Sequence, residues 1–334
     1  MEVDRSVDFI PFPTEAPSRN PLVGHDRLHA DRYHGSLALE LTALTPIFIA
    51  AGITAMGSDV GVAIPLIRVM GQDSNGNPIL QGTSLKGCLR AVYETITNSS
   101  VGVEGTKPSG NHKPNKVEGK WLEERRTSKL SPAELVFGAL GFQGLISIAD
   151  AVGDRPLEMG YLPPMFQPRS GNGRKFYRHE TPHPSASNSV NHAPGKRPAE
   201  PDKPPSPIQQ APIDTLFFTT LRFSNLTLAQ VGALCVALGL NPDDPNDPNY
   251  SFALKLGAGK GKGLGGVKVR LVKHSIIKGD SLTQARYLDY HPTPQRPPSK
   301  SVLTDAVKAA HATLIHKRQL EQLRDILRQP GANA

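Results

Sequence analysis

Hydroxyl and positively charged side chains meet at the start of a predicted helix over residues 84–97. Thr83 and Ser84 follow a glycine and offer N-cap hydroxyls, while Lys86 and Arg90 lie one helical turn apart on a shared face. A helix N-terminus has unpaired backbone N–H groups and a partial positive charge, and both attract phosphate. The pattern therefore predicts a phosphate-binding helix start, with an ordinary amphipathic helix carrying solvated cations as the alternative.

A second group of candidate phosphate ligands is the glycine-rich loop over residues 257–266, which contains Lys260 and Lys262. It differs from a nucleotide-hydrolysing P-loop because no Ser or Thr follows a Gly-Lys pair and the next residues alternate like a strand. We expect its backbone N–H groups and two lysines to follow a phosphodiester backbone without reading its sequence. A glycine-rich hairpin loop without a ligand is the alternative.

The proline-rich segment 160–213 interleaves basic and aromatic residues, including Arg174, Lys175, Phe176 and Tyr177. Charge combined with stacking is the way single-stranded nucleic acid is bound without sequence preference. We expect this segment to contact nucleic acid, with a disordered linker between two domains as the alternative.

Two further stretches contain polar residues of interest. Residues 50–77 are glycine-rich and predict a loop, in which Arg68 is a candidate contact to nucleic acid and Asp59 a candidate catalytic carboxylate. His25, His29 and His34 lie near one another in the sequence, as a metal site or acid–base chemistry would require. They occupy no convincing helix, so exposed polar histidines are the alternative reading.

The composition narrows the class of partner. With 334 residues and a net charge of +8, the chain can bury a core and favours an acidic partner, nucleic acid first. Cys88 and Cys235 are the only cysteines, each in an apolar helical pattern, which indicates buried thiols and excludes a cysteine-based zinc site. No apolar run approaches the roughly 18 residues that span a bilayer. We therefore expect a cytoplasmic protein with no membrane contact.

The periodic segments predict an α+β fold. Alternating or helical patterns occur at a strand over 36–45, a helix over 84–97, a strand over 144–151, a strand over 214–224, a helix over 227–240 and a strand with its loop over 252–272. This βαββαβ order is typical of ferredoxin-like or RRM-like folds, which often bind RNA. The predicted organisation is an N-terminal arm at 1–35, a domain at 36–273 with insertions at about 98–130 and 160–213, and a C-terminal extension at 274–334 with one helix over 301–327.

Three motifs resemble those of one protein family. Gly82–Arg90 is similar to the Gly-Ser-Ser-Leu-Lys-Gly-x-Leu-Arg helix start of the repeat-associated mysterious protein (RAMP) superfamily of CRISPR systems. Phe137–Asp150 resembles that family's Phe-Gly followed by a short strand ending in Asp, and Leu256–Val267 resembles its terminal glycine-rich loop. The motifs come in the family's order and cover the chain from about 36 to 273.

The helix-start motif most resembles the backbone subunits of type III effector complexes. This resemblance implies a subunit that binds guide RNA, contacts target RNA and joins other effector subunits. It also implies that Ser84, Lys86 and Arg90 hold guide phosphates, that Lys260 and Lys262 support the same path, and that 160–213 forms a thumb near the guide–target duplex.

The chain departs from the cleaving members of this family in the loop before the helix. Those members carry Val-Asp-x-Pro, whereas this chain has Val62-Ala63-Ile64-Pro65, with alanine in place of the aspartate that metal-dependent cleavage needs. We therefore expect a subunit that does not cut and has no tightly bound cofactor. The alternatives are a target-RNA endoribonuclease using Asp59 with Mg²⁺ or Mn²⁺, a guide-processing enzyme using His34 as general acid or base, and a cap at the guide end.

Overall fold

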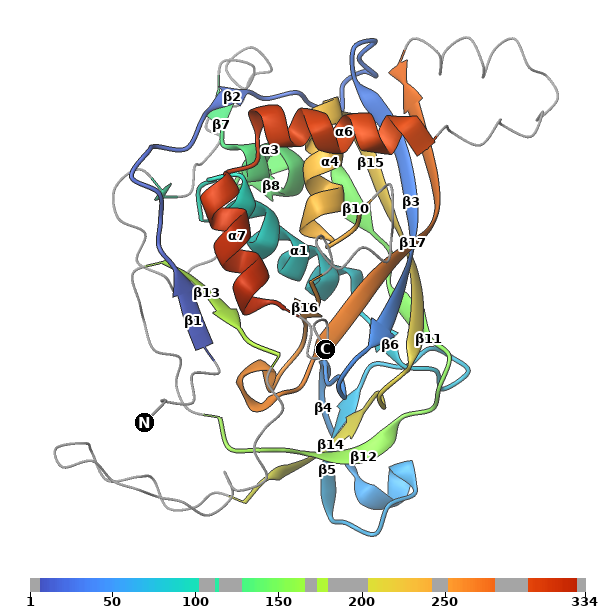
Figure 1. Cartoon of the computed structure of the whole chain (residues 1–334). Helices are drawn as coiled ribbons and strands as arrows, with labels where there is room; N and C mark the ends of the chain where they lie inside the picture. The colour runs from blue at the N-terminus through green and yellow to red at the C-terminus, as the bar shows by residue number, and fades with distance from the viewer. Residues whose placement is uncertain are drawn as a thin grey trace, which may run out of the picture.

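The computed structural model describes residues 7–101, 112–113, 128–165, 173–179, 204–241, 252–279 and 300–328. Its centre is a seven-stranded sheet in which every pairing is antiparallel (Figure 1). The strand order is β16 (Leu254–Lys255), β17 (Gly266–Lys278), β3 (Tyr33–Ala43), β15 (Leu216–Leu226), β11 (Ala151–Gly153) and β6 (Ile79–Leu80), and β10 (Ile146–Ile148) also pairs with β15.

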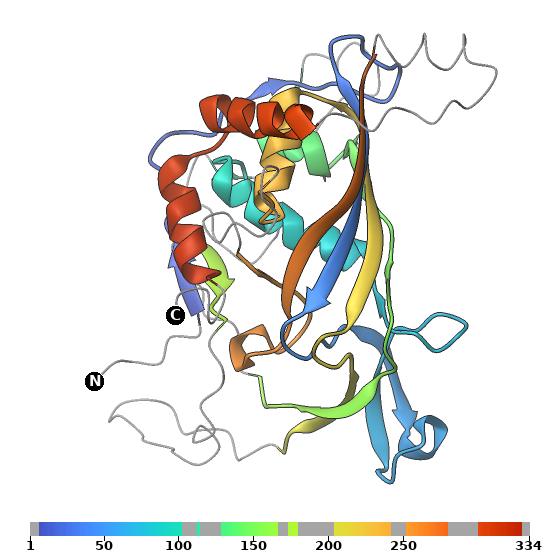
Figure 2. The ribbon, with the colours of Figure 1, turned by 45° about the vertical axis from the view of Figure 1, so that its right-hand side comes forward.

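Helices cover one face of this sheet, and no helix in the described part of the chain covers the other face (Figure 2). They are α1 (Gly82–Ile96), α4 (Leu228–Ala237), α6 (Lys300–Thr313) and α7 (Lys317–Ile326). The chain order of β3, α1, β10 with β11, β15, α4 and β17 follows the predicted βαββαβ order, and β3 lies beside β15 at the centre of the sheet. The predicted α+β fold of ferredoxin-like type is therefore confirmed.

The alternation in β15 explains why this strand has one buried face. Phe217, Leu221 and Phe223 are buried toward the helices, whereas Phe218 and Arg222 are exposed on the other face. A period of two places successive side chains on opposite faces, so the apolar set packs beneath the helices.

The helix α4 is apolar on almost every side because a second layer of helix covers it. Its start has a capping box, in which the Gln230 N–H donates to Thr227 Oγ1 over 3.1 Å. At Gly232 an added Cβ would lie 1.9 Å from the Ala306 carbonyl oxygen of α6. Glycine at this position therefore allows the two helices to pack in direct backbone contact.

The C-terminal tail was predicted as one helix over 301–327, but it forms α6 and α7 with a break between them. Leu314 and Ile315 both donate to the Ala310 carbonyl, and the second of these bonds spans five residues, so the regular α-helical pattern ends here. His316 then donates its N–H over 2.7 Å to the carbonyl of Ile96, the last residue of α1. A tertiary hydrogen bond thus redirects the chain at a point where the apolar pattern continues.

Residues 50–77 were predicted as a loop, and this prediction is wrong. They form β4 (Ala50–Met56), the 3₁₀ turn η1 (Gly57–Val60) and β5 (Leu66–Met70). With β12 (Glu158–Leu162) and β14 (Ser206–Gln210) these strands make a second sheet in the order β12-β14-β5-β4. The glycine content concealed both strands, and β5 pairs not only with neighbouring β4 but also with β14, from a distant part of the chain.

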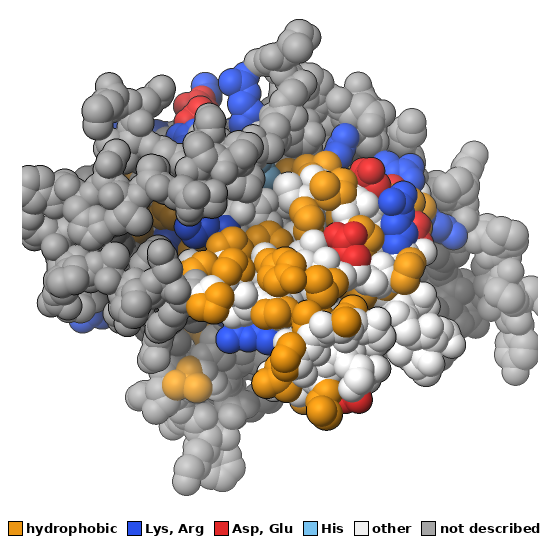
Figure 3. Space-filling view, turned by 90° about the horizontal axis from the view of Figure 1, so that it is seen from below, with side chains coloured by type: hydrophobic (Ala, Val, Ile, Leu, Met, Phe, Trp, Pro, Cys, Tyr) orange, Lys and Arg blue, Asp and Glu red, His pale blue; other side chains and the backbone are white. Residues whose placement is uncertain are grey.

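Hydrophobic side chains gather on the underside of the molecule, where this second sheet lies (Figure 3). Among the exposed large apolar residues, Ile53 and Met56 belong to β4, Leu66 to β5, and Met159 and Tyr161 to β12. One side of the second sheet therefore exposes apolar side chains, whereas residues such as Ile67 and Ile208 on strands of the same sheet are buried.

Short pairs complete the described fold. They are β1 (Val7–Ile10) with β13 (Arg174–Tyr177), β2 (Asn20–Pro21) with β7 (Lys129–Leu130), and β8 (Gly138–Ala139) with β9 (Phe142–Gln143), together with α3 (Pro132–Phe137) and the 3₁₀ turn η4 (Lys260–Lys262). Arg178, which directly follows β13, joins three of the outer elements, because it forms ion pairs with Asp8 of β1 at 2.5 Å and with Asp325 of α7 at 3.2 Å. No helix among the described residues is long and apolar enough to cross a membrane.

Candidate nucleic-acid interface

The start of α1 is held by the protein itself. The N-cap residue is Gln81, without a side-chain cap, so the prediction that Thr83 or Ser84 caps the helix is wrong. Instead, the Gly82 N–H donates to Asp150 Oδ1 over 2.7 Å. An added Cβ at Gly82 would lie 2.1 Å from the Ile148 carbonyl oxygen, so only glycine allows this close approach. A carboxylate of the chain therefore already occupies the positive end of the helix.

The two cations of the helix start lie away from Ser84. Lys86 is half-buried and its Nζ donates to the Ile146 carbonyl of β10 over 3.0 Å, and burial, with nearby Arg90, lowers its pKa. Arg90 Nε donates to Glu94 Oε1 over 2.7 Å within α1. Since each helical residue turns the side chain by about 100°, Lys86 lies roughly 200° around the helix from Ser84.

The glycine-rich loop is pinned by a lysine that sequence reasoning missed. Lys255 is only 6% exposed, and its Nζ donates to the carbonyls of Gly263 and Leu264, each over 3.2 Å. Burial, with the charge of Lys260, lowers the pKa of Lys255 to about 8. Its place between Leu254 and Leu256, inside an apolar run, was the available signal that this cation turns inward.

N–H groups of the loop donate both within the loop and to the segment that precedes β4. Leu264 donates to the Gly259 carbonyl, Gly265 to the Pro46 carbonyl, and Gly266 to Thr45 Oγ1. The loop also bends through Gly259 and Gly263, whose φ values of 72° and 90° fit glycine. These bonds fix the loop's shape and position Lys260 at its turn.

In β13, neighbouring basic residues face different surroundings. Arg174 is 6% exposed, donates to the Ser99 carbonyl and lies with its guanidinium 4.9 Å from the centre of the Phe12 ring. Burial lowers the pKa of Arg174 to about 10. Lys175 instead lines a cleft, so β13 directs one cation inward and one to a ligand-accessible surface.

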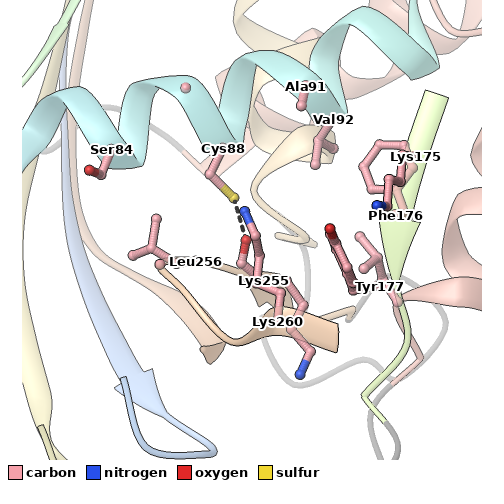
Figure 4. Close-up of a pocket in the computed structure, with 13 residues that line it drawn as sticks. Ser84, Cys88, Ala91, Val92, Lys175, Phe176, Tyr177, Lys255, Leu256 and Lys260 are labelled. Carbon is pink, nitrogen blue, oxygen red and sulfur yellow. Dashed lines mark hydrogen bonds between the residues drawn. The ribbon is translucent and has the colours of Figure 1, made fainter. Parts of the chain in front are cut away.

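That cleft has a volume of about 350 Å³ and lies between α1, β13, the glycine-rich loop and the end of α7. Ser84, Lys175 and Lys260 line it together with Lys255 and Tyr177 (Figure 4). The Nζ atoms of Lys175 and Lys260 lie 5.1 Å and 5.8 Å from the centre of the Tyr177 ring. The fold thus gathers three of the predicted binding residues, from segments far apart in the sequence, around one basic and aromatic hollow.

The remaining predicted site residues lie elsewhere. Asp59 is exposed in η1 and accepts a 3.5 Å hydrogen bond from Ser58 Oγ, and Arg68 is exposed on β5 of the second sheet. Lys262 lies in η4 outside the lining of the cleft. Within the described ranges, no three His, Cys, Asp or Glu side chains form a group that could hold a metal ion.

The three histidines of the N-terminal arm do not form one reactive group. His34 is buried, its Nδ1 accepts the Asn225 N–H over 3.2 Å, and burial lowers its pKa. His25 and His29 line a separate cleft of about 410 Å³ beside Phe142. His34 therefore packs in the protein interior, where it supports the fold through its bond to Asn225.

Cys88 and Cys235 are free thiols, and burial raises the pKa of each. Cys88 donates to the Lys255 carbonyl over 3.3 Å. Most of the two expected insertions lies outside the described residues, including 102–111, 114–127, 166–172 and 180–203. The thumb expected within 160–213 falls mainly in that part.

This chain is similar to subunits of two solved CRISPR complexes and to one protein-family model. A chain of "Cryo-EM structure of the Type III-B Cmr-beta bound to cognate target RNA" is 17% identical, with a TM-score of 0.35 over 74% of this chain and 62% of that one, so this chain spans less than two thirds of its length. A chain of "Type IV-B CRISPR Complex" is 16% identical, with a TM-score of 0.36 over 79% of this chain and 96% of that one. A comparison with curated protein sequences found no match. The model of the RAMP superfamily matches residues 40–268, which include β15, both core helices and the glycine-rich loop, and the chain therefore belongs to the RAMP superfamily.

Proposed function

We propose that this chain is a guide-RNA-binding backbone subunit of a type III CRISPR ribonucleoprotein. In that role it contacts guide phosphates and the guide–target duplex, joins other effector subunits and does not cut. Membership of the RAMP superfamily supports the class of protein. The observation that carries the proposal is the cleft in which Ser84, Lys175 and Lys260 meet beside Tyr177.

The cleft suits a phosphodiester chain for electrostatic reasons. Two half-exposed ammonium groups lie at one aromatic ring, and a hydroxyl lies across from them on α1. Lysine side chains neutralise phosphates and release counterions, which gives affinity without base specificity. Lys255 has a supporting role, because it holds the loop that carries Lys260.

The other cations contribute differently in this proposal. Lys86 and Arg90 stabilise α1 against β10 and within the helix, so their effect on RNA is indirect. Lys262 extends the basic surface along η4. Arg68, on β5, contacts RNA only where the RNA passes the second β-sheet.

Binding is tested with the full chain and a labelled single-stranded RNA over a range of salt concentrations. For single strands each neutralised phosphate contributes about 0.7 to the salt slope, so Lys175→Ala with Lys260→Ala should lower the slope by about 1.4. Lys308→Ala, which removes an exposed lysine of α6, is the matched control and should leave it unchanged. An unchanged slope in the double variant would show that the cleft is not the RNA path.

The non-cleaving part of the proposal rests on Ala63 and on the surroundings of Asp59. Ala63 stands in the β4–β5 loop where cleaving relatives carry aspartate, and Asp59 is exposed with one short-range partner. Metal-dependent cleavage needs a carboxylate held in fixed geometry. The test is to map target cuts in the assembled complex with Mg²⁺ or Mn²⁺, for wild type and Asp59→Ala. No cut opposite this subunit is expected, whereas a cut that Asp59→Ala removes would identify a ribonuclease.

A further inference from the structure

We infer that the cleft beside Tyr177 holds one unstacked nucleotide of an RNA strand, with its base inside the cleft and its phosphates on Lys175 and Lys260. The inference rests on the proposed RNA-binding function and adds a base-binding role to it. It starts from the difference between the rim of the cleft and its interior.

The interior of the cleft is largely apolar, and the buried side chain of Lys255 is the charged group that also lines it. Val92 of α1, Phe176 of β13, Leu256 of the loop and Leu327 after α7 line it, and each of these residues is less than 9% exposed. A surface that only grips phosphates has no need of an apolar interior, since phosphate oxygens are satisfied by cations and N–H groups at the surface. A base has apolar faces and a polar edge, and it gains from burial against such side chains.

The size of the cleft limits the ligand. At about 350 Å³ it lies near the lower end of small-molecule sites, which span roughly 300–1,000 Å³. A space of this size accommodates a single base. The hydroxyls of Ser84 and Tyr177 are the side-chain groups that line it and can both donate to and accept from a base edge.

Gly87 is the second, independent observation. It lies in the middle of α1 and lines the cleft, and an added Cβ would meet nothing within 4 Å. Gly82 and Gly265 are explained by close backbone contacts inside the protein, at 2.1 Å and 1.9 Å from an added Cβ, but Gly87 has no such contact. A glycine in a helix interior costs about 1 kcal/mol relative to alanine. Packing within the protein therefore does not require glycine at position 87, and the missing side chain leaves room for a ligand beside the helix.

Ion pairs and hydrogen bonds hold the elements that form the walls of the cleft. Arg178 links β13 to Asp8 in β1 and to Asp325 in α7, and Lys255 fixes the loop through its two hydrogen bonds. Figure 4 shows the labelled side chains of α1, β13 and the loop converging on one space. Three elements that the sequence separates widely therefore share one preformed hollow.

The test compares two strands that carry the same phosphates. The full-length protein is titrated with a six-nucleotide RNA and with a six-unit abasic RNA, and the ratio of their dissociation constants is measured. We expect the wild type to bind the abasic strand roughly tenfold more weakly, as for the loss of one stacked base. Gly87→Phe, which fills the cleft without changing any charge, should reduce the ratio to about one, whereas Ala312→Phe, which adds the same side chain at an exposed position of α6, should keep it.

Each outcome decides the inference. A wild-type ratio near one, with tight binding of both strands, would leave the phosphate-binding function standing and refute the base site. A ratio that stays near ten in Gly87→Phe would place base recognition elsewhere and also refute it. If neither strand binds, the proposed function itself fails. Circular dichroism verifies folding, and Gly87→Leu replaces Gly87→Phe if the larger side chain disturbs α1.

Discussion

Replacing Lys255 with methionine should remove a pH-dependent part of the folding stability. In the folded protein burial lowers the pKa of this lysine from 10.5 to about 8. Because the folded-state pKa is the lower one, the unfolded chain binds more protons between about pH 8 and pH 10.5, and the wild type gains stability as pH rises through that window. Below pH 8 both states are protonated and the full cost of the buried charge is present.

The magnitude follows from the two pKa values. One pKa unit is 1.36 kcal/mol, so complete deprotonation restores about 3 kcal/mol, of which about 2 kcal/mol appears between pH 7 and pH 9.5. Lys255→Met also loses the hydrogen bonds to Gly263 and Leu264. That loss changes the difference in unfolding free energy between wild type and variant by the same amount at every pH, so any pH dependence of the difference comes from the ammonium group. Cys88, Lys260 and His179, titratable neighbours of Lys255, are present in both proteins.

The assay is urea unfolding of wild type and Lys255→Met at pH 7, 8, 9 and 9.5. The wild type should gain about 2 kcal/mol relative to the variant over this range. Lys308→Met, which removes an exposed charge on α6, is the control and should run parallel to the wild type. Parallel curves for wild type and Lys255→Met would refute the conclusion that this ammonium is buried at a cost.

Three further predictions concern the start of α1 and the interior. Gly82→Ala should destabilise the fold by more than 2 kcal/mol, because its Cβ would lie 2.1 Å from the Ile148 carbonyl oxygen. Gly87→Ala, in contrast, should be neutral or should stabilise the fold by up to about 1 kcal/mol. Equal midpoints of urea unfolding for the two variants would contradict this difference. Asp150→Ala should cost about 1–2 kcal/mol through loss of the bond to the Gly82 N–H, measured by the same unfolding, and an unchanged midpoint would show that the helix start needs no carboxylate. Burial lowers the pKa of His179 to about 4 from 6.5, so stability should fall as pH drops from 6.5 to 4, and a His179→Gln variant that falls as steeply would assign the effect to other groups.

Local sequence patterns were sufficient to predict several elements of the fold. The strand predicted over 214–224 corresponds to β15 at Leu216–Leu226, and the helix predicted over 227–240 corresponds to α4 at Leu228–Ala237. Period-two burial and a Thr-x-x-Gln capping box act within a few residues, so they can be read from the sequence alone. The second sheet could not be read in this way, because β5 acquires its partner β14 from a segment more than 100 residues later.

For the candidate site, the sequence alone determined which residue types were available: the hydroxyl of Ser84, the lysines of β13 and of the glycine-rich loop, and the aromatic Tyr177. Tertiary structure alone decided which of them meet. Lys86 lies two residues from Ser84 but faces β10, whereas Lys260 lies 176 residues from Ser84 and shares its cleft. The physical reason is that helical rotation and strand alternation separate near neighbours, while burial of apolar faces brings distant segments together. The same packing turned Lys255 inward, where an ammonium became the support of a loop instead of a surface charge.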